Sequence, residues 1–301
     1  MATSDNEKPF DLSGNSSARD GFGYFAFHQY QGFWFYAKGI ENVKDFQQNF
    51  KALDTDIVIA TLPKAVSPHD LVPFADYKHV YPPGYNHLEH ELDSPSRLTA
   101  THVPYPSLPE SIRSCINCKV VYLCKNPKDN FISLWHFMNK LRAFPALQED
   151  NGYRAPLSIE EALEFFCSGV SIFGPFWDHI LGYWKESLEN PHRGLFLKYE
   201  DLKKEPKTQA RRLAEFMGYG FSTEDESRGV IEEILHLCSF QNLKDLDVNK
   251  NGNFTDRVKN IEFYRKGEVA DWKNHLRLPM VERLDRLVND KFQGSGLVFE
   301  N

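Results

Sequence analysis

Short apolar runs without alternating polar residues recur through the middle of the chain, and they predict buried strands. Residues 56–61 (DIVIAT) are rich in β-branched side chains, which suits a strand covered on both faces of a parallel sheet. Residues 119–124 and 194–199 show the same pattern, and residues 97–101 form a weaker fourth run. The sequence therefore predicts a parallel sheet built from these four strands.

Signals for helix starts and ends lie between and after these runs. Asn126 and Pro127 supply an N-cap followed by a first-turn proline, and residues 158–161 (SIEE) form a capping box. Pro206 begins another helix that Gly218 can end. Strands that alternate with helices predict an α/β fold in which a central parallel β-sheet is flanked by helices on both faces.

The N-terminal part of the chain holds a dense aromatic run. Nine of the fifteen residues from Phe22 to Tyr36 are aromatic. We favour packing in the hydrophobic core, because large aromatic side chains dominate protein interiors. A wall that lines a pocket for an apolar ligand is the alternative, and the two roles can coexist.

Length and composition restrict the class of protein. The 301 residues, 41% hydrophobic and 26% charged, suffice for one large core, so we expect a single domain at 21–301 after a flexible polar N-terminus at 1–20. The first residues lack the apolar stretch of a secretion signal, and no segment reaches the length of a membrane span. We therefore expect a cytosolic protein without a membrane partner.

Charge and cysteine content narrow the class further. The formal charge of −7 argues against nucleic-acid binding, which needs a basic surface to neutralise phosphates, so any anion site must be local. Five scattered cysteines do not make a disulfide framework for a chain of this size. Cys115 and Cys118 form a lone CxxC pair, which we interpret as ordinary thiols because no second pair and no suitably spaced histidine accompanies them.

Residues able to bind an anion or move a proton follow the predicted strands. Lys64 comes shortly after the strand at 56–61, His102 follows the weaker run, and Lys125 lies between 119–124 and a helix N-terminus. Because the carboxyl ends of parallel strands meet at one edge of a sheet, we expect these side chains to lie close together. Together they predict an anion site with a possible general base.

Eight stretches carry a family resemblance, and they occur in the order in which the family has them. They are YQGFW at 30–34, THVP at 101–104, YLCKN at 122–126, WHF at 135–137, GPFWDH at 174–179, YEDLK at 199–203, RKGE at 265–268 and DWK at 271–273. From Tyr30 onward the chain resembles cytosolic sulfotransferases of the plant type.

The resemblance implies a P-loop-like α/β fold and one kind of reaction. A sulfuryl group would pass from 3′-phosphoadenosine 5′-phosphosulfate to the hydroxyl of a small organic acceptor such as a flavonoid, steroid or hormone. The resemblance implies no metal and no covalent intermediate. By its match to the family, His102 would be the general base, which suits an imidazole because its pKa lies near 7. Lys64 would stabilise charge on the leaving phosphate.

The remaining donor contacts are also implied by the resemblance. Lys125 and Ser133 would bind the 3′-phosphate, Tyr199 would lie beside the adenine, and the Arg265-Lys266-Gly267 loop would close over the 3′-phosphate, with the glycine allowing close backbone approach. Taken singly, Lys64 could be a solvated surface lysine, Ser133 a packed helix residue, Tyr199 a core tyrosine, and residues 265–267 a solvated basic turn.

The chain departs from the family most clearly after Lys64. The family continues with Ser-Gly-Thr-Thr-Trp and a helix, whereas residues 65–74 here read AVSPHDLVPF. We therefore expect the cradle for the sulfuryl-bearing phosphate and the first helix to be missing, with an irregular crossover in their place. Lys125 replaces a common family arginine, which removes a bidentate contact. The animal dimer motif is not matched, so we expect a monomer.

Three hypotheses follow from these features. The first is an active sulfotransferase with His102 as base. The second is a catalytically impaired member that still binds a ligand or a nucleotide, because the donor loop after Lys64 is shortened. A nucleotide kinase is the weakest, since no Gly-x-x-x-x-Gly-Lys-Ser/Thr segment is present to hold ATP.

Overall fold

Four parallel strands form the centre of the molecule. The computed structural model describes residues 19–21, 25–64, 72–76, 96–142, 155–255 and 258–300. Strands β4 (Ile57–Thr61), β5 (Leu98–Thr101), β6 (Lys119–Cys124) and β7 (Gly194–Lys198) lie in the order β5-β4-β6-β7. The predicted parallel sheet is confirmed, and Tyr199 begins the next helix instead of ending β7.

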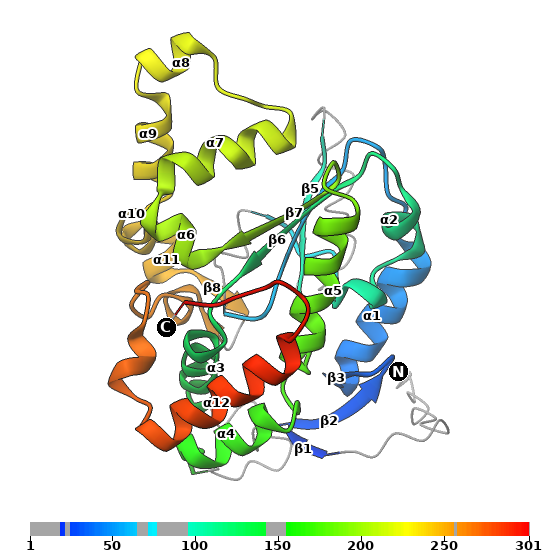
Figure 1. Ribbon diagram of the computed structural model, residues 1–301, viewed down its shortest axis with the longest axis vertical. Coiled ribbons are helices and arrows are strands. Elements are labelled where there is room, and N and C mark those ends of the chain that lie inside the picture. Colours follow the sequence, from blue (N-terminus) through cyan, green and yellow to red (C-terminus); the bar gives the residue numbers. More distant parts are fainter. Residues whose placement is uncertain are drawn as a thin grey trace, which may run out of the picture.

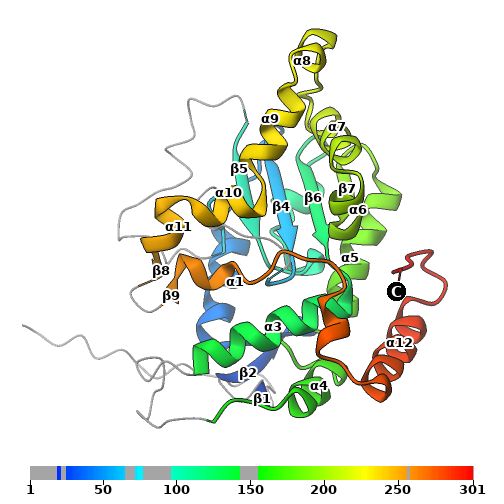
Figure 2. The ribbon, with the colours of Figure 1, turned by 90° about the vertical axis from the view of Figure 1, so that its left-hand side faces the viewer.

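Helices cover both faces of this sheet in a single domain (Figures 1 and 2). On one face, Val58 of β4 and Tyr122 of β6 enter the main hydrophobic core together with residues of α1 (Ala37–Asn49), α3 (Pro127–Arg142) and α5 (Phe176–Glu189). On the other face, Ile57 and Val121 pack with residues of α7 (Pro206–Met217). Successive side chains of a strand point to opposite faces, so each strand contributes to both layers.

The predicted helix signals are present in the structure. In α4 (Ile159–Cys167), Ser158 and Glu161 form the reciprocal capping box. Helix α7 begins at Pro206 and ends at Met217, and its C-cap is Gly218, whose φ of 89° is the left-handed conformation that glycine adopts without strain. The other described elements are α2 (Glu110–Ser114), α6 (Tyr199–Lys204), α8 (Thr223–Ser227), α9 (Val230–Leu237), α10 (Phe240–Asp245), α11 (Asp247–Asn251), α12 (Leu278–Phe292), short 3₁₀ turns at Tyr105–Ser107, Asn260–Phe263 and Asp271–Asn274, and the strand pair β8 (Asn253–Thr255) and β9 (Val258–Lys259).

The aromatic run forms an antiparallel hairpin that packs into the core. Strands β2 (Phe25–Tyr30) and β3 (Phe33–Tyr36) are joined by two residues with positive φ, Gln31 and Gly32, and β1 (Arg19–Gly21) extends the small sheet. Phe33, Trp34 and Phe35 are buried, so core packing is confirmed for these residues. Phe22 and Tyr24 lie outside the described residues.

Most of the crossover from β4 to β5 lies outside the described residues. The expectations for residues 65–71, including the shortened loop, therefore stay predictions. Residues 72–76, here called the edge segment, run along the outer side of β5 through a parallel bridge between Phe74 and Ala100. The backbone N–H of Ala75 donates to the carbonyl of Ala100 at 2.9 Å, and that of Ala100 donates to the carbonyl of Pro73 at 2.8 Å.

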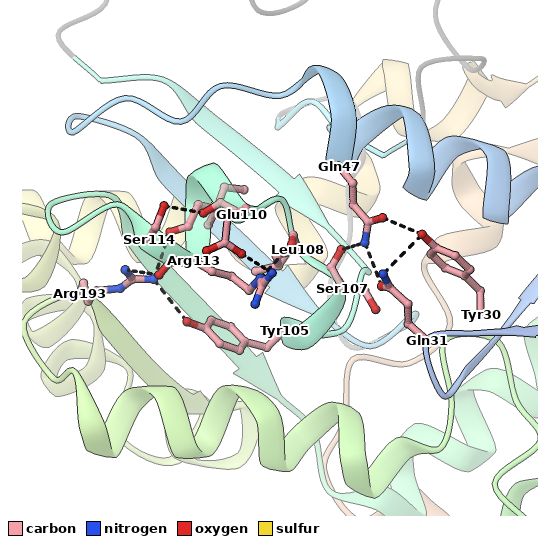
Figure 3. A network of polar contacts seen from close by, with 11 residues as sticks. Tyr30, Gln31, Gln47, Tyr105, Ser107, Leu108, Glu110, Arg113, Ser114 and Arg193 are labelled. Atoms are coloured by element: carbon pink, nitrogen blue, oxygen red, sulfur yellow. Dashed lines mark hydrogen bonds and ion pairs between the residues drawn. The ribbon is translucent and has the colours of Figure 1, made fainter.

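A buried arginine, Arg193, ties three elements together at the amino end of the sheet, and Figure 3 shows it beside Tyr105 and Arg113. Arg193 precedes β7, is 5% exposed, and places its Nε 2.8 Å from Oε1 of Glu186 in α5. Its guanidinium also donates to the carbonyls of Ile112, Arg113 and Cys115 at the end of α2. It satisfies carbonyls that a helix C-terminus leaves without partners inside the helix.

We expect Arg193→Ala to lower the free energy of unfolding by about 3–5 kcal/mol, because it leaves the Glu186 carboxylate buried without its cation. The matched control is Arg211→Ala, which breaks an ion pair with Glu226 in which both side chains are more than 40% exposed. That change should cost less than about 1 kcal/mol. Urea denaturation measures the free energy of unfolding of both variants. Equal decreases in the two would contradict the structural role of Arg193.

Candidate donor and catalytic site

A cavity of about 440 Å³ opens at the carboxyl edge of the sheet. It lies between the ends of β4 and β6, the start of α6, the segment from α9 to α10, and the loop after the Asn260–Phe263 turn. The structure brings the predicted donor residues together in its wall, although they come from distant parts of the chain. They are Lys64, Lys125, Ser133, Tyr199, Arg265, Lys266 and Gly267.

The Pro63-Lys64 turn is fixed against α3. The side-chain amide of Asn130 donates to the carbonyl of Pro63 at 3.0 Å, and Lys64 has a φ of 69°. The Lys64 ammonium lies 4.5 Å from the ring centre of Phe137 and 4.6 Å from that of Phe263. It also donates to the carbonyl of Phe263 at 3.3 Å. In this conformation the ammonium is held by aromatic faces and carbonyl groups.

Burial lowers the pKa of Lys64 to about 7, and the positive charges of Lys140 and Lys125 act in the same direction. The carboxylate of Glu262 partly opposes this shift. A large share of the Lys64 side chains is therefore neutral at pH 7. A bound anion would favour the charged form.

Lys125 and Tyr199 lie together in the cavity wall. Lys125 is 8% exposed, and its ammonium lies 5.1 Å from the ring centre of Tyr199. The Tyr199 hydroxyl donates to the carbonyl of Gly267 at 2.9 Å, which fastens the ring to the 265–267 loop. Burial lowers the pKa of Lys125, while the carboxylate of Asp129 acts in the opposite direction.

Two buried carboxylates hold the basic loop in place. Asp271 is 2% exposed and accepts from Arg265 at 2.5 Å and from Lys266 at 2.6 Å. Burial acts to raise the pKa of Asp271, but hydrogen bonds from Lys266, Asn274 and Arg265 outweigh it and hold the pKa well below its usual range. Asp129, in the first turn of α3, accepts the backbone N–H groups of residues 270 and 272 at 2.7 and 3.0 Å.

Gly267 occupies a position that only glycine fits. Its φ is 69°, and a Cβ atom added there would lie 2.5 Å from the ring of Phe240. The backbone of the basic loop therefore rests directly on α10. This contact places the loop against an aromatic side chain of the cavity wall.

His102 lies apart from the cavity wall, deeper in the fold. It is 3% exposed, and its ring lies 4.7 Å from that of Phe74 and 5.6 Å from that of Phe173. Its Nδ1 is 2.7 Å from the carbonyl oxygen of Thr61, three residues before Lys64. Since a carbonyl can only accept, Nδ1 carries the proton, and the neutral ring keeps its basic lone pair on Nε2.

The electrostatic surroundings keep His102 neutral. Burial lowers the pKa of His102 to about 4, and the positive charge of Lys64 lowers it further. The hydrogen bond to Thr61 opposes the shift. An unprotonated imidazole at neutral pH is the form that a general base requires.

Several wall residues were not predicted from the sequence. Leu235, Phe240 and Leu243 of α9 and α10 add apolar side chains to the wall, and Lys203 adds a further cation. The role of Asp271 was also missed, although the DWK stretch that contains it was noted. With Lys64, Lys125, Arg265 and Lys266, the wall concentrates positive charge in a chain whose formal net charge is −7.

Two absences apply to the described part of the chain. No group of three or more histidine, cysteine, aspartate or glutamate side chains in it could hold a metal ion. None of its helices is long and apolar enough to cross a membrane.

A parallel sheet with a basic cavity at its carboxyl edge is typical of proteins that bind phosphorylated nucleotides. The sequence profile of the sulfotransferase domain matches residues 46–296. The chain therefore belongs to the sulfotransferase family, a family of transferases that use 3′-phosphoadenosine 5′-phosphosulfate.

Curated relatives agree with this assignment. The chain is 42% identical over 301 residues to cytosolic sulfotransferase 15 of Arabidopsis thaliana, covering 90% of this chain and 81% of the relative. It is 39% identical over 309 residues to the flavonol 4′-sulfotransferase of Flaveria chlorifolia, covering 92% of each.

Solved structures show the same fold. A putative steroid sulphotransferase of Arabidopsis thaliana superposes with a TM-score of 0.70 at 34% identity, covering 95% of this chain and 93% of that one. A mouse sulfotransferase complexed with PAP superposes with a TM-score of 0.69 at 22% identity, covering 90% and 96%. The second likeness supports the fold alone.

Proposed function

We propose that the protein transfers a sulfuryl group from 3′-phosphoadenosine 5′-phosphosulfate to the hydroxyl of a small organic acceptor in the cytosol. One observation carries the proposal: the candidate donor residues from five separate stretches of the chain line a single cavity. Flavonols and steroids are reasonable acceptor classes, since relatives are named for them. We further propose a monomer, because the animal dimer motif is absent from the sequence.

The cavity wall combines cations with aromatic and apolar side chains, which suit the phosphates and the base of the donor. Lys125, Arg265 and Lys266 would meet the 3′-phosphate, since their cations can donate charge-assisted hydrogen bonds to its oxygens. Ser133, one and a half turns into α3, adds a hydroxyl to the same wall. Tyr199 and Phe240 offer aromatic faces for the adenine base.

His102 and Lys64 would divide the chemical step between them. As the acceptor oxygen attacks sulfur, its proton passes to Nε2 of His102, and the bond between sulfur and the bridging oxygen breaks. The negative charge that remains on the departing phosphate would be stabilised by the Lys64 ammonium. No metal is needed for this balance of charge, because the protein supplies both the base and the cation.

The sequence after Lys64 favours a second candidate, a member with strongly reduced turnover. Residues 65–71 contain one hydroxyl side chain, Ser67, where the family has Ser-Gly-Thr-Thr. A single lost oxyanion-type donor costs roughly a hundred- to a thousandfold in rate. Binding of the nucleotide through its 3′-phosphate would survive this change, because Lys125, Arg265 and Lys266 are retained.

The experiment is an assay of radiolabelled sulfate transfer to a panel of phenols, steroids and flavonols, run beside a relative with the complete loop. We expect transfer on the order of a hundredfold or more below that of the relative. Equal turnover would show that the residues after Lys64 replace the cradle. Absence of transfer, with nucleotide binding retained, would leave only the binding function.

The pKa of Lys64 predicts a proton uptake. At pH 8 the group is mostly neutral in the free protein, because its pKa is about 7, and the charges of a bound nucleotide should restore its proton. We expect the affinity for 3′-phosphoadenosine 5′-phosphate to fall as pH rises above 7. Calorimetry at pH 8 in two buffers of different ionisation heat should detect the uptake in the wild type and not in Lys64→Met. Equal uptake by both proteins would contradict the assignment.

A further inference from the structure

We propose that His179 and Asp76 are positioning residues, the first holding the backbone C=O of His102 and the second flanking its backbone N–H, and that they fix the imidazole that removes the acceptor proton. The inference rests on the proposed function, since it requires His102 to be the base. Both residues are buried, and neither lines the donor cavity. His179 belongs to α5, and Asp76 belongs to the edge segment.

The backbone carbonyl of His102 is held by a side chain of α5. His179 is fully buried, and its Nε2 lies 2.9 Å from the carbonyl oxygen of His102. Since a carbonyl can only accept, Nε2 carries the proton, and Nδ1 can accept from the Tyr122 hydroxyl 3.0 Å away. Burial lowers the pKa of His179 to about 3, so the ring stays neutral and keeps this arrangement at neutral pH.

The N–H side of His102 faces the edge segment. The Asp76 carboxyl is 3% exposed. Burial raises the pKa of Asp76 to about 7, and the Thr101 hydroxyl and the backbone N–H of His102, which lie beside the carboxyl, act in the opposite direction. The Thr101 oxygen in turn accepts from the backbone N–H of Val103 at 3.0 Å. The pairing with β5 also brings the Phe74 ring against the His102 ring. The edge segment therefore lies against both the backbone and the ring of His102.

With its backbone C=O held by His179 and its ring packed against Phe74, His102 has little freedom to turn. The hydrogen bond from Nδ1 to Thr61 then persists, and Nε2 stays the unprotonated nitrogen. Near-attack geometry is sensitive to small shifts, since a displacement of about 1 Å can cost on the order of a hundredfold in rate. A purely structural role would instead affect stability without changing the state of the His102 ring.

Two pairs of variants separate these roles. His179→Leu and Asp76→Ala remove the contacts, whereas His179→Gln keeps a donor and Asp76→Asn keeps an acceptor. Turnover and acceptor KM are measured with saturating donor. The ring-nitrogen NMR signals of His102 are followed in histidine-labelled protein and assigned with His102→Gln. The NMR arm requires no activity.

We expect His179→Leu and Asp76→Ala to lower kcat by roughly ten- to a hundredfold with little change in acceptor KM, and to give His102 signals of mixed tautomers. The Gln and Asn variants should keep most of the turnover and a single tautomer. Folded Leu and Ala variants with unchanged kcat and unchanged His102 signals would overturn the proposal. So would a Gln variant as impaired as the Leu variant.

A further variant covers the case in which the Leu and Ala proteins do not fold. Tyr122→Phe keeps the core volume but removes the hydroxyl that faces Nδ1 of His179, so it should loosen the hold on the His102 carbonyl. Unchanged His102 signals and turnover in this variant would overturn the proposal. A wild type without transfer, but with a single His102 tautomer that the Leu variant disturbs, would refute the proposed function and support the positioning role.

Discussion

Replacing His102 by alanine is expected to lower the turnover of sulfuryl transfer by roughly 10²–10⁴-fold, the usual contribution of a general base. The acceptor hydroxyl would then have to lose its proton to water. Affinity for 3′-phosphoadenosine 5′-phosphate should stay within about twofold, because the loss would fall on the transition state and the ring lies outside the donor cavity.

The matched control is His192→Ala, which removes an exposed histidine from the turn before β7. It should leave turnover unchanged. Steady-state assays with calorimetry measure both variants. Full turnover in His102→Ala would exclude this residue as the base. A parallel loss of nucleotide binding would instead point to a disturbance of the sheet edge.

Removing the charge of Asp271 is the second change with a large expected effect. In Asp271→Asn the cations of Arg265 and Lys266 lose their shared carboxylate, and the free energy of unfolding should fall by about 3–5 kcal/mol. The basic loop would also lose its fixed position, so nucleotide affinity should fall as well. Asp290→Asn, at an exposed position of α12, is the matched control and should change neither property.

Denaturation at several pH values tests this assignment further. Because the folded pKa of Asp271 is depressed, its stabilisation is complete above the unfolded pKa of about 4 and is lost as pH falls below it. The difference in stability between wild type and Asp271→Asn should therefore shrink in acid. A difference that is independent of pH would contradict the role of the carboxylate.

The sheet could be predicted because its strands are locally unambiguous. Residues 120–124 form an uninterrupted apolar run, and the strand predicted at 119–124 became β6 without a shift. The Ser158 capping box marked the start of α4. Lys64 and Lys125 could be placed on one edge because the ends of parallel strands converge there. The family resemblance added Ser133, Tyr199 and the 265–267 loop, which no periodicity indicates.

The apolar residues of the cavity wall could not be predicted in the same way. Phe240 belongs to α10, a helix of six residues, and such short helices carry weak signals in sequence. The roles of Asp271 and Asp76 depend on partners that the fold brings together. Asp129, for instance, reaches a loop more than 140 residues away. A carboxylate that organises a distant loop has the same local sequence appearance as a solvated one.

The most direct test of the donor site compares two nucleotides by calorimetry on the wild-type protein: 3′-phosphoadenosine 5′-phosphate and adenosine 5′-phosphate. The two differ only in the 3′-phosphate, which we assign to Lys125, Ser133, Arg265 and Lys266. Each charge-assisted hydrogen bond contributes about 1.5–3 kcal/mol, so the 3′-phosphorylated nucleotide should bind at least about tenfold to a hundredfold more tightly. Equal affinities would contradict the assignment of this cavity as the donor site.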